Sequence, residues 1–137
     1  MSRSGYSDDI DDNWQLIRYR GRVASAVRGK RGQTFFRDLL AALDALPEKR
    51  LIANDLIKDG EVCAIGALGK ARGVDMTALD PDDPQGVAGV FNIAECLACE
   101  VVYFNDEIGW RETPEERFAR MRKWVSEQLR ADTSAAP

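Results

Sequence analysis

The stretch "TFFRDLLAALDALP", residues 34–47, constrains the fold most, because its apolar side chains recur every three or four residues. An α-helix has 3.6 residues per turn, so this spacing places them on a single face. Pro47 ends the pattern, since proline cannot continue a helix. The apolar positions are Phe36, Leu39, Leu40, Leu43 and Leu46. They predict a core helix that must pack against further helices.

A second helix signal precedes this stretch. Residues 13–28 carry apolar side chains at helical spacing, and the aspartates before them supply helix-capping chemistry. Gly29 and Gly32 are expected to interrupt the pattern, and Thr34 is expected to cap the helix that follows. The apolar positions of the first helix are Leu16, Tyr19, Val23 and Val27.

Three further helices are indicated in the second half of the chain. Residues 61–72 read as a helix, and Gly73 stands where a left-handed residue is needed. Asp83 followed by Pro84 is a cap and first-turn pair that predicts another helix start. Residues 113–130 open with Thr-Pro-Glu-Glu, the pattern of a capping box, before another apolar stripe.

These signals predict an all-α protein, a compact bundle of five to six helices. The main departure would be one short β-hairpin near residues 50–63, because Asp59-Gly60 is a turn dipeptide. A chain of 137 residues suits one domain with one core. The expected organisation is a flexible acidic N-terminal arm (1–12), a single helical domain (13–130) and a disordered tail (131–137).

Composition argues against several classes of protein. No apolar run comes near the roughly 20 residues that span a bilayer, which predicts a soluble protein without a membrane partner. The chain also has no histidine, the residue most often used as a general base near neutral pH. Three cysteines without an export signal favour reduced thiols and a cytoplasmic location. The Cys96 and Cys99 pair lacks the further ligands that zinc needs. We therefore predict no metal, no cofactor and no enzyme; catalysis would require Glu61, Glu100 and residues 105–107 to converge.

Charge is distributed unevenly along the chain. Residues 13–37 carry seven basic residues and no acid, whereas residues 38–137 carry eleven basic and nineteen acidic residues. This polarity can steer charged partners. Trp14 beside arginine would form a partner-binding anchor. The candidate partner-binding residues of the basic face are Trp14, Arg18, Arg22, Arg28, Lys30 and Arg31.

The stretch 87–107 has the apolar spacing of a helix-turn-helix, with Asn92 at the turn. Its second helix carries only acidic charges, which would oppose a phosphate backbone. We therefore expect a helix pair that packs like the motif without entering DNA. The acidic candidates for partner binding are Glu95, Glu100, Asp106 and Glu107.

Three motifs add a resemblance. Gly29-Lys30-Arg31-Gly32, Cys63-Ala64-Ile65-Gly66-Ala67 and Asn105-Asp106-Glu107 are the most specific elements of a similarity that covers residues 20–130. On these, the chain resembles a group of small uncharacterised phage and prophage proteins of bacteria. Such a resemblance implies a non-enzymatic protein in the cytoplasm of the host bacterial cell. There it would bind and inhibit a host protein complex, most readily a bacterial defence system, in the manner of anti-CRISPR proteins.

Two alternatives stay open for the basic segment 18–31. It can bind nucleic acid with modest affinity, since clustered Arg and Lys neutralise phosphates. It can also be structural, if Lys30 and Arg31 fix the turn between two helices by pairing with carboxylates of the body such as Asp38 or Asp44.

Overall fold

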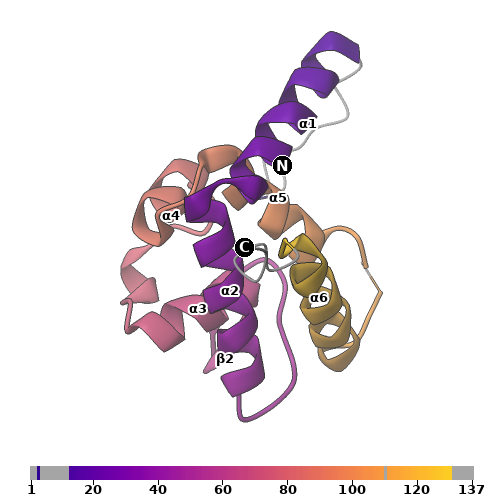
Figure 1. The fold of residues 1–137 in the computed structure, drawn as a ribbon. Coiled ribbons are helices and arrows are strands. Elements are labelled where there is room, and N and C mark those ends of the chain that lie inside the picture. The colour runs from indigo at the N-terminus through magenta and orange to yellow at the C-terminus, as the bar shows by residue number, and fades with distance from the viewer. Residues whose placement is uncertain (1–2, 4–12, 110, 131–137) are drawn as a thin grey trace, which may run out of the picture.

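The computed structural model describes residues 3, 13–109 and 111–130, and within these ranges the expected all-α bundle with one short hairpin is confirmed (Figure 1). The expected arm 1–12, apart from Arg3, and the expected tail 131–137 lie outside the described residues. The elements are α1 (Asn13–Arg28), α2 (Lys30–Ala45), β1 (Ile57–Lys58), β2 (Glu61–Val62), α3 (Ala64–Arg72), the 3₁₀-helix η1 (Met76–Ala78), α4 (Pro84–Phe91), α5 (Glu95–Asp106) and α6 (Pro114–Gln128).

Helix α2 is the centre of the bundle and packs against α1, α3 and α6. Its apolar face is buried, as the spacing predicts, with Phe36 and Leu39 fully enclosed. The expected start at Thr34 is wrong, because α2 already begins at Lys30 with Gly29 as its N-cap. Gly32 lies inside the helix, where an added Cβ would come within 1.9 Å of the Ala26 carbonyl oxygen. This glycine therefore allows α1 and α2 to approach closely and does not interrupt the helix.

The hairpin explains why α3 starts later than predicted. Ile57 pairs with Val62 in an antiparallel ladder, so residues 61–62 are a strand and not the first turn of a helix. Asp59 and Gly60 both have positive φ at the turn. Cys63 then caps α3, with its Sγ accepting a hydrogen bond from the Gly66 N–H at 3.3 Å.

Local signals in the second half of the chain are confirmed. Gly73 and Asn92 both adopt the left-handed conformation. Asp83 caps α4 by accepting from the Gly86 N–H at 3.2 Å. Helices α4 and α5 are bent by 105° relative to one another. In the described ranges no single helix has the length and apolarity to cross a membrane, although this bent pair passes that test of length and composition jointly.

Helix α6 closes the bundle with the predicted capping box. The Thr113 hydroxyl accepts from the Glu116 N–H at 3.1 Å, and the Glu116 carboxylate accepts from the Thr113 N–H at 2.8 Å. Trp124 stacks on Phe104 with ring centroids 4.4 Å apart.

Helix α1 has two unlike halves. Its C-terminal half packs against α5 and α2, with Val23 buried, and just before this half the Tyr19 hydroxyl donates to the Cys96 carbonyl at 3.3 Å. Its N-terminal half extends beyond the body of the bundle (Figure 1). The basic segment singled out by the sequence thus lies partly on an arm that projects from the core.

Candidate interaction surface

The arginines of α1 lie on two sides of the helix. Arg18 and Arg22 are exposed beside the start of α5, where they line a shallow hollow with Gly21, Ala94 and Cys96. Arg20, which the sequence analysis did not single out, lies on the other side of α1. Every charged side chain on α1 is therefore basic and exposed.

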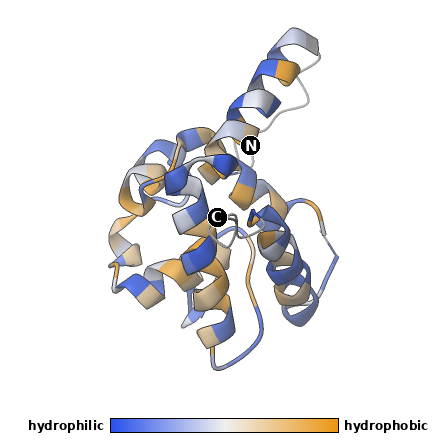
Figure 2. Ribbon diagram, in the orientation of Figure 1, coloured by the Kyte–Doolittle hydropathy of each residue, from blue (hydrophilic) through white to orange (hydrophobic). Residues whose placement is uncertain are grey.

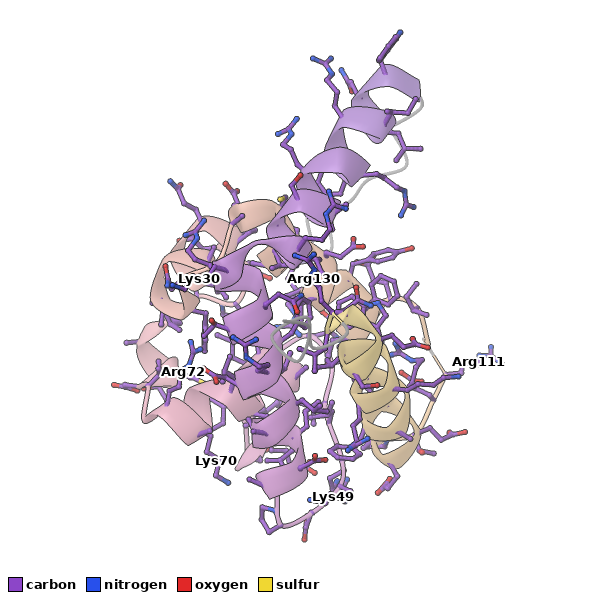
Figure 3. All side chains as sticks on the ribbon, viewed as in Figure 1. Lys30, Lys49, Lys70, Arg72, Arg111 and Arg130 are labelled. Carbon is purple, nitrogen blue, oxygen red and sulfur yellow. The ribbon has the colours of Figure 1, made fainter. Side chains whose placement is uncertain are left out.

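The remaining basic candidates lie at the junction of α1 and α2. Lys30 is exposed there, and Figure 3 shows it to the left of the top of α2, with Arg130 to the right. The Arg31 guanidinium donates to the Asn92 side-chain oxygen at 3.4 Å, and the Arg28 carbonyl accepts from Arg130 at 3.5 Å. The junction thus holds cations close to the turn between α4 and α5.

The two carboxylates named as examples for the structural alternative of Lys30 and Arg31 pair with other residues. Asp38 pairs with Arg72 at 2.8 Å, and Asp44 pairs with Arg122 at 2.6 Å. Both carboxylates that were expected to fix the turn are therefore engaged by other arginines.

The acidic candidates do not form one surface. Glu95 is exposed, and Glu100 and Glu107 lie half-buried along the side of α5 next to α1. Asp106 is different, because its side chain is only 4% exposed and it accepts from the Arg3 guanidinium at 2.8 Å. The prediction that Asp106 belongs to a partner-binding acidic face is therefore corrected: this carboxylate is internal. Its partner comes from the N-terminal stretch that composition alone classes as an acidic arm.

The pKa of Asp106 lies below its ordinary value. Burial opposes ionisation of this carboxyl group, but the hydrogen bond and the positive charge of Arg3 outweigh it, with help from Asn105 and the Asn54 N–H. The Asp106 carboxylate thus stays ionised in a buried, hydrogen-bonded site.

The cysteines have the character of packed thiols. Burial raises the pKa of Cys99 to about 11, and burial also raises the pKa of Cys96. Raised values disfavour the thiolate that a redox or metal-binding cysteine needs. Among the described residues no group of three or more His, Cys, Asp or Glu side chains could hold a metal ion.

The Asn105 side chain ties separate parts of the fold together, a role that the sequence did not reveal. Its Oδ1 accepts from the Ala64 N–H at 3.1 Å, and its Nδ2 donates to the Ile52 carbonyl at 2.9 Å. Buried Arg117 donates to the Asn105 carbonyl at 2.9 Å. Glu61, which a catalytic role would bring together with these residues, instead pairs with Arg50 at 2.6 Å. The Asn105-Asp106 dipeptide therefore connects elements of the fold through internal hydrogen bonds.

The exposed side of α1 presents a surface that we call the outward face. It consists of Trp14 and Ile17 on the projecting half and Gly21 where the helix meets the bundle, with Arg18 and Arg22 along the edge next to the start of α5. Trp14 is 70% exposed and Ile17 is 61% exposed. Figure 2 shows hydrophobic and hydrophilic residues side by side on this half, and Figure 3 shows its side chains extending away from the other helices. The sequence analysis identified Trp14, Arg18 and Arg22 but missed Ile17 and Gly21. Their spacing of three and seven residues from Trp14 was the available signal.

The described residues give no reason for Gly21 to lack a side chain. An added Cβ would meet none of their atoms within 4 Å, and the residue lies inside a helix, where glycine is less stable than alanine by about 1 kcal/mol. The glycines of α3 contrast with it: at Gly66 an added Cβ would come within 1.9 Å of the Leu56 carbonyl oxygen. A bare backbone on an exposed helix face allows another molecule to approach closely.

Helix α1 also covers part of α5. Tyr19 contacts the Cys96 carbonyl, and the first half of α5 lines the hollow beside Arg18 and Arg22. In a DNA-binding helix-turn-helix the start of the second helix reaches the bases. Here that region is partly occupied by α1.

A groove runs along the other side of α1 and encloses about 990 Å³. We call it the α1–α5 groove, since those two helices form its walls and Gln128 of α6 lies at its edge. Both polar and apolar side chains line it. They are Leu16, Tyr19, Arg20, Val23, Ala24, Val27, Arg28, Glu100, Tyr103, Phe104, Glu107, Ile108 and Gln128.

No protein-family model, no curated protein and no solved structure matches this chain.

Proposed function

We propose that this is a non-enzymatic interaction protein that docks the outward face of α1 onto a host protein complex. The observation that carries the proposal is the exposure of two large apolar side chains on α1, Trp14 at 70% and Ile17 at 61%, close to Gly21 on the same face. Apolar anchors beside arginine are typical of the residues that dominate protein interfaces. The resemblance to phage proteins favours a bacterial defence complex as the target.

The charge of α1 defines the chemistry of the partner. This helix carries four arginines and no acid, and Arg18, Arg20 and Arg22 are all exposed. A helix that offers apolar anchors flanked by cations fits an apolar groove with an acidic rim. An acidic rim on the partner would attract the arginines of α1 and speed association, and the same arginines would repel basic partners.

Gly21 favours a solid protein surface over a lipid surface. A basic helix with exposed tryptophan and isoleucine also has the composition of a membrane-surface helix. A fluid lipid layer, however, adapts to a side chain at position 21, so a glycine there would bring no advantage. A packed protein surface does not adapt, and it benefits from the missing Cβ.

Nucleic-acid binding is the second candidate. Arg18 and Arg22 lie beside the start of α5, and Arg31 reaches Asn92 just before it, so cations from α1 and α2 gather at one place. Ala94 offers no side-chain cap at this helix end. Such a cluster can contact phosphates, and its binding would weaken steeply with salt.

The test is capture from the lysate of a bacterial host with tagged wild-type protein and matched variants, with and without nuclease. Gly21→Ala and Gly89→Ala form one pair, because both residues are exposed, helical and free of contacts at the Cβ position. Trp14→Ala with Ile17→Ala is paired with Val90→Ala, which shortens an exposed apolar side chain on α4. Mass spectrometry identifies and quantifies what is captured.

We expect a stoichiometric, nuclease-resistant host protein with wild type, Gly89→Ala and Val90→Ala. We expect at least about tenfold less with the Trp14/Ile17 double variant, since truncating a buried anchor costs about 2 kcal/mol or more. Gly21→Ala should also weaken capture. Equal capture by all variants would overturn the proposed surface, and recovery that disappears with nuclease would instead support nucleic-acid binding.

A further inference from the structure

We infer that Asp106 forms a guanidinium-binding site, and that its occupant, Arg3, ties the start of the chain to the body and so stabilises the N-terminal half of α1 for docking. The observation behind it is a buried contact between residues 103 positions apart. The site itself does not depend on the proposed function. Its consequence for docking rests on that function, because the stabilised half of α1 carries Trp14 and Ile17 of the outward face.

The contact between Arg3 and Asp106 has the two-pronged geometry of a specific guanidinium site. The Arg3 side chain is 2% exposed, and the Asp106 side chain is nearly as buried. Arg3 Nε donates to Asp106 Oδ2, and Arg3 Nη2 donates to Asp106 Oδ1 at 2.8 Å. Arginine can engage both oxygens of a carboxylate in this way, whereas the ammonium group of lysine acts as a point charge. The geometry therefore selects a guanidinium group over other cations.

The Asp106 carboxylate is held in position by residues other than Arg3. Its Oδ1 accepts from the Asn54 N–H at 3.1 Å and from the Asn105 Nδ2 at 2.8 Å. Asn105 is fixed in turn by the Ala64 N–H and the Ile52 carbonyl. A carboxylate that is already oriented loses little freedom when it binds a ligand. The body of the protein thus supplies a preformed receptor for the guanidinium group.

The surroundings of the site favour a positive charge. Asp106 is the last residue of α5, and the C-terminal end of a helix attracts cations. Burial acts against the charged form of Arg3, but Cys63 and Asp106 outweigh it and raise the pKa of this arginine. Arg3 Nη1 is buried and has no acceptor in the described part of the chain. The paired hydrogen bonds to Asp106 therefore carry the recognition.

The chain between Arg3 and α1 is short. Nine residues separate Arg3 from Asn13, the first residue of α1. Beyond the projecting half, α1 is held to the body again at buried Val23. Contacts with the body at residues 3 and 23 therefore close this part of the chain into a loop. The loop contains Trp14 and Ile17.

Closing this loop favours the helical form of the projecting half. Nine residues of the loop lie outside α1, and unfolding of residues 13–22 would about double that number. Each doubling of a flexible loop makes its closure about threefold less favourable. Arg3 therefore stabilises the helical form of this half by about threefold. A helix that is already formed loses less conformational freedom when it docks onto a partner.

The experiment is chemical rescue of Arg3→Ala with ethylguanidinium, which supplies the atoms that this substitution removes. Ethylammonium at the same millimolar concentration and ionic strength is the matched control ligand. The double variant Arg3→Ala with Asp106→Asn is the control protein, because it lacks the carboxylate. Thermal unfolding followed by circular dichroism reports on the site. Hydrogen exchange followed by NMR reports on α1.

Thermal unfolding tests the guanidinium site. Arg3→Ala should lower the melting temperature by about 10 °C, because it leaves the buried Asp106 carboxylate without its counter-charge. Ethylguanidinium should restore most of this loss, ethylammonium should not, and neither should stabilise the double variant. Rescue by both cations alike, or by neither, would overturn the site.

Hydrogen exchange separates the tie from a merely structural role of the ion pair. In Arg3→Ala the amides of residues 16–20 should exchange about threefold faster relative to those of residues 23–28. Ethylguanidinium should leave this ratio unchanged, because the free ligand is not joined to the chain. Protection of residues 16–20 that returns with ethylguanidinium would overturn the tie.

A second variant keeps the ion pair and slackens the loop. About twenty glycine and serine residues inserted after Gly5 should leave the melting temperature near that of wild type. The longer loop should still raise the exchange ratio by about twofold, since closure depends on loop length. The same insertion after Arg130 is the control and should leave the ratio unchanged. Equal ratios in both insertion variants would overturn the tie.

Capture from the bacterial lysate tests the consequence for docking. Arg3→Ala should capture up to about threefold less partner than wild type, and ethylguanidinium should not restore the capture. Full capture by a variant whose exchange ratio has risen would overturn the consequence for docking. A wild-type protein that captures nothing would overturn the proposed function, while thermal rescue and hydrogen exchange would still decide on the Arg3 site.

Discussion

At the scale of single residues, the role of Asp106 depends on a partner 103 positions away in the sequence. The run Asn105-Asp106-Glu107 near a helix end predicts that both acids face solvent. Glu107 lines the groove beside α1 and is half-buried. Asp106 points inward because Arg3 meets it there. Local sequence reasoning has no signal for such a pair, since neither periodicity nor capping chemistry links residue 3 to residue 106.

The first prediction concerns pH. The pKa of the Asp106 carboxyl group is lowered, so its contribution to stability is fully present above the pKa of the unfolded chain, about 3.9. That contribution is lost as the pH falls through the lower pKa of the folded state. Asp106→Asn should reduce the free energy of unfolding by about 3 kcal/mol at pH 7, because it leaves Arg3 buried without its counter-charge.

Urea unfolding followed by tryptophan fluorescence between pH 7 and pH 3 checks this prediction. The difference between wild type and Asp106→Asn should hold down to about pH 4 and narrow below it. Asp82→Asn, an exposed carboxylate in the loop before α4, is the control and should differ from wild type by less than about 0.5 kcal/mol. A difference that stays constant to pH 3 would contradict an ionic role for Asp106.

At the scale of elements, local chemistry predicts most helix ends and tertiary contacts decide the rest. The Thr113 capping box, the Asp83 cap and the left-handed Asn92 follow from residues within one turn of the helix end. The start of α3 does not, because strand pairing between residues 57 and 62 competes with the helix. The prediction that Gly32 interrupts a helix was wrong for a similar reason. This glycine allows α1 to pack closely against α2, and no local sequence pattern indicates such a tertiary contact.

The second prediction concerns the two halves of α1. Trp14 and Ile17 are 70% and 61% exposed, whereas Val23 is buried. Tertiary packing supplies most of the stability of a short helix in water, so the two halves should differ in stability. Backbone amides of residues 16–20 should therefore exchange with solvent at least about tenfold faster than those of residues 23–28. Hydrogen exchange followed by NMR measures this ratio directly.

Gly21→Ala should slow exchange in the N-terminal half of α1, because alanine stabilises a helix interior by about 1 kcal/mol relative to glycine. Gly89→Ala should leave α1 unchanged, since it lies on α4. Uniform protection along α1 would show that the projecting half is held by contacts other than those described.

At the scale of the whole molecule, the sequence predicts the helical bundle and the separation of basic from acidic segments. It does not predict where these charges lie on the folded surface. Apolar residues at helical spacing predict five to six helices around one core, and the described residues form six α-helices. This spacing does not reveal that the first half of α1 extends beyond the bundle, because that depends on where the contacts between α1 and α5 end. The basic segment therefore had two readings in the sequence, and the candidate surface emerges only from the exposure of Trp14 and Ile17.

The third prediction concerns long-range electrostatics. Because α1 is basic and the rest of the chain is acidic, the protein should associate through α1 with a partner whose binding groove has an acidic rim. The association rate should fall as ionic strength rises. Arg18→Ala with Arg22→Ala should lower both the association rate and its salt dependence. Stopped-flow measurement with the captured partner checks this. Lys58→Ala with Lys123→Ala removes the same charge elsewhere on the surface and should have a smaller effect.

The packing of α1 on α5 also has a consequence for synthesis of the chain. Domains form from the N-terminus as the ribosome adds about 5–20 residues per second, so α1 leaves the ribosome seconds before α5 exists to receive it. During that interval Tyr19 and Val23, as well as Trp14 and Ile17, face solvent. The cations we assign to recognition then also serve the nascent chain, because a helix with like charges on every side resists association with its copies on neighbouring ribosomes.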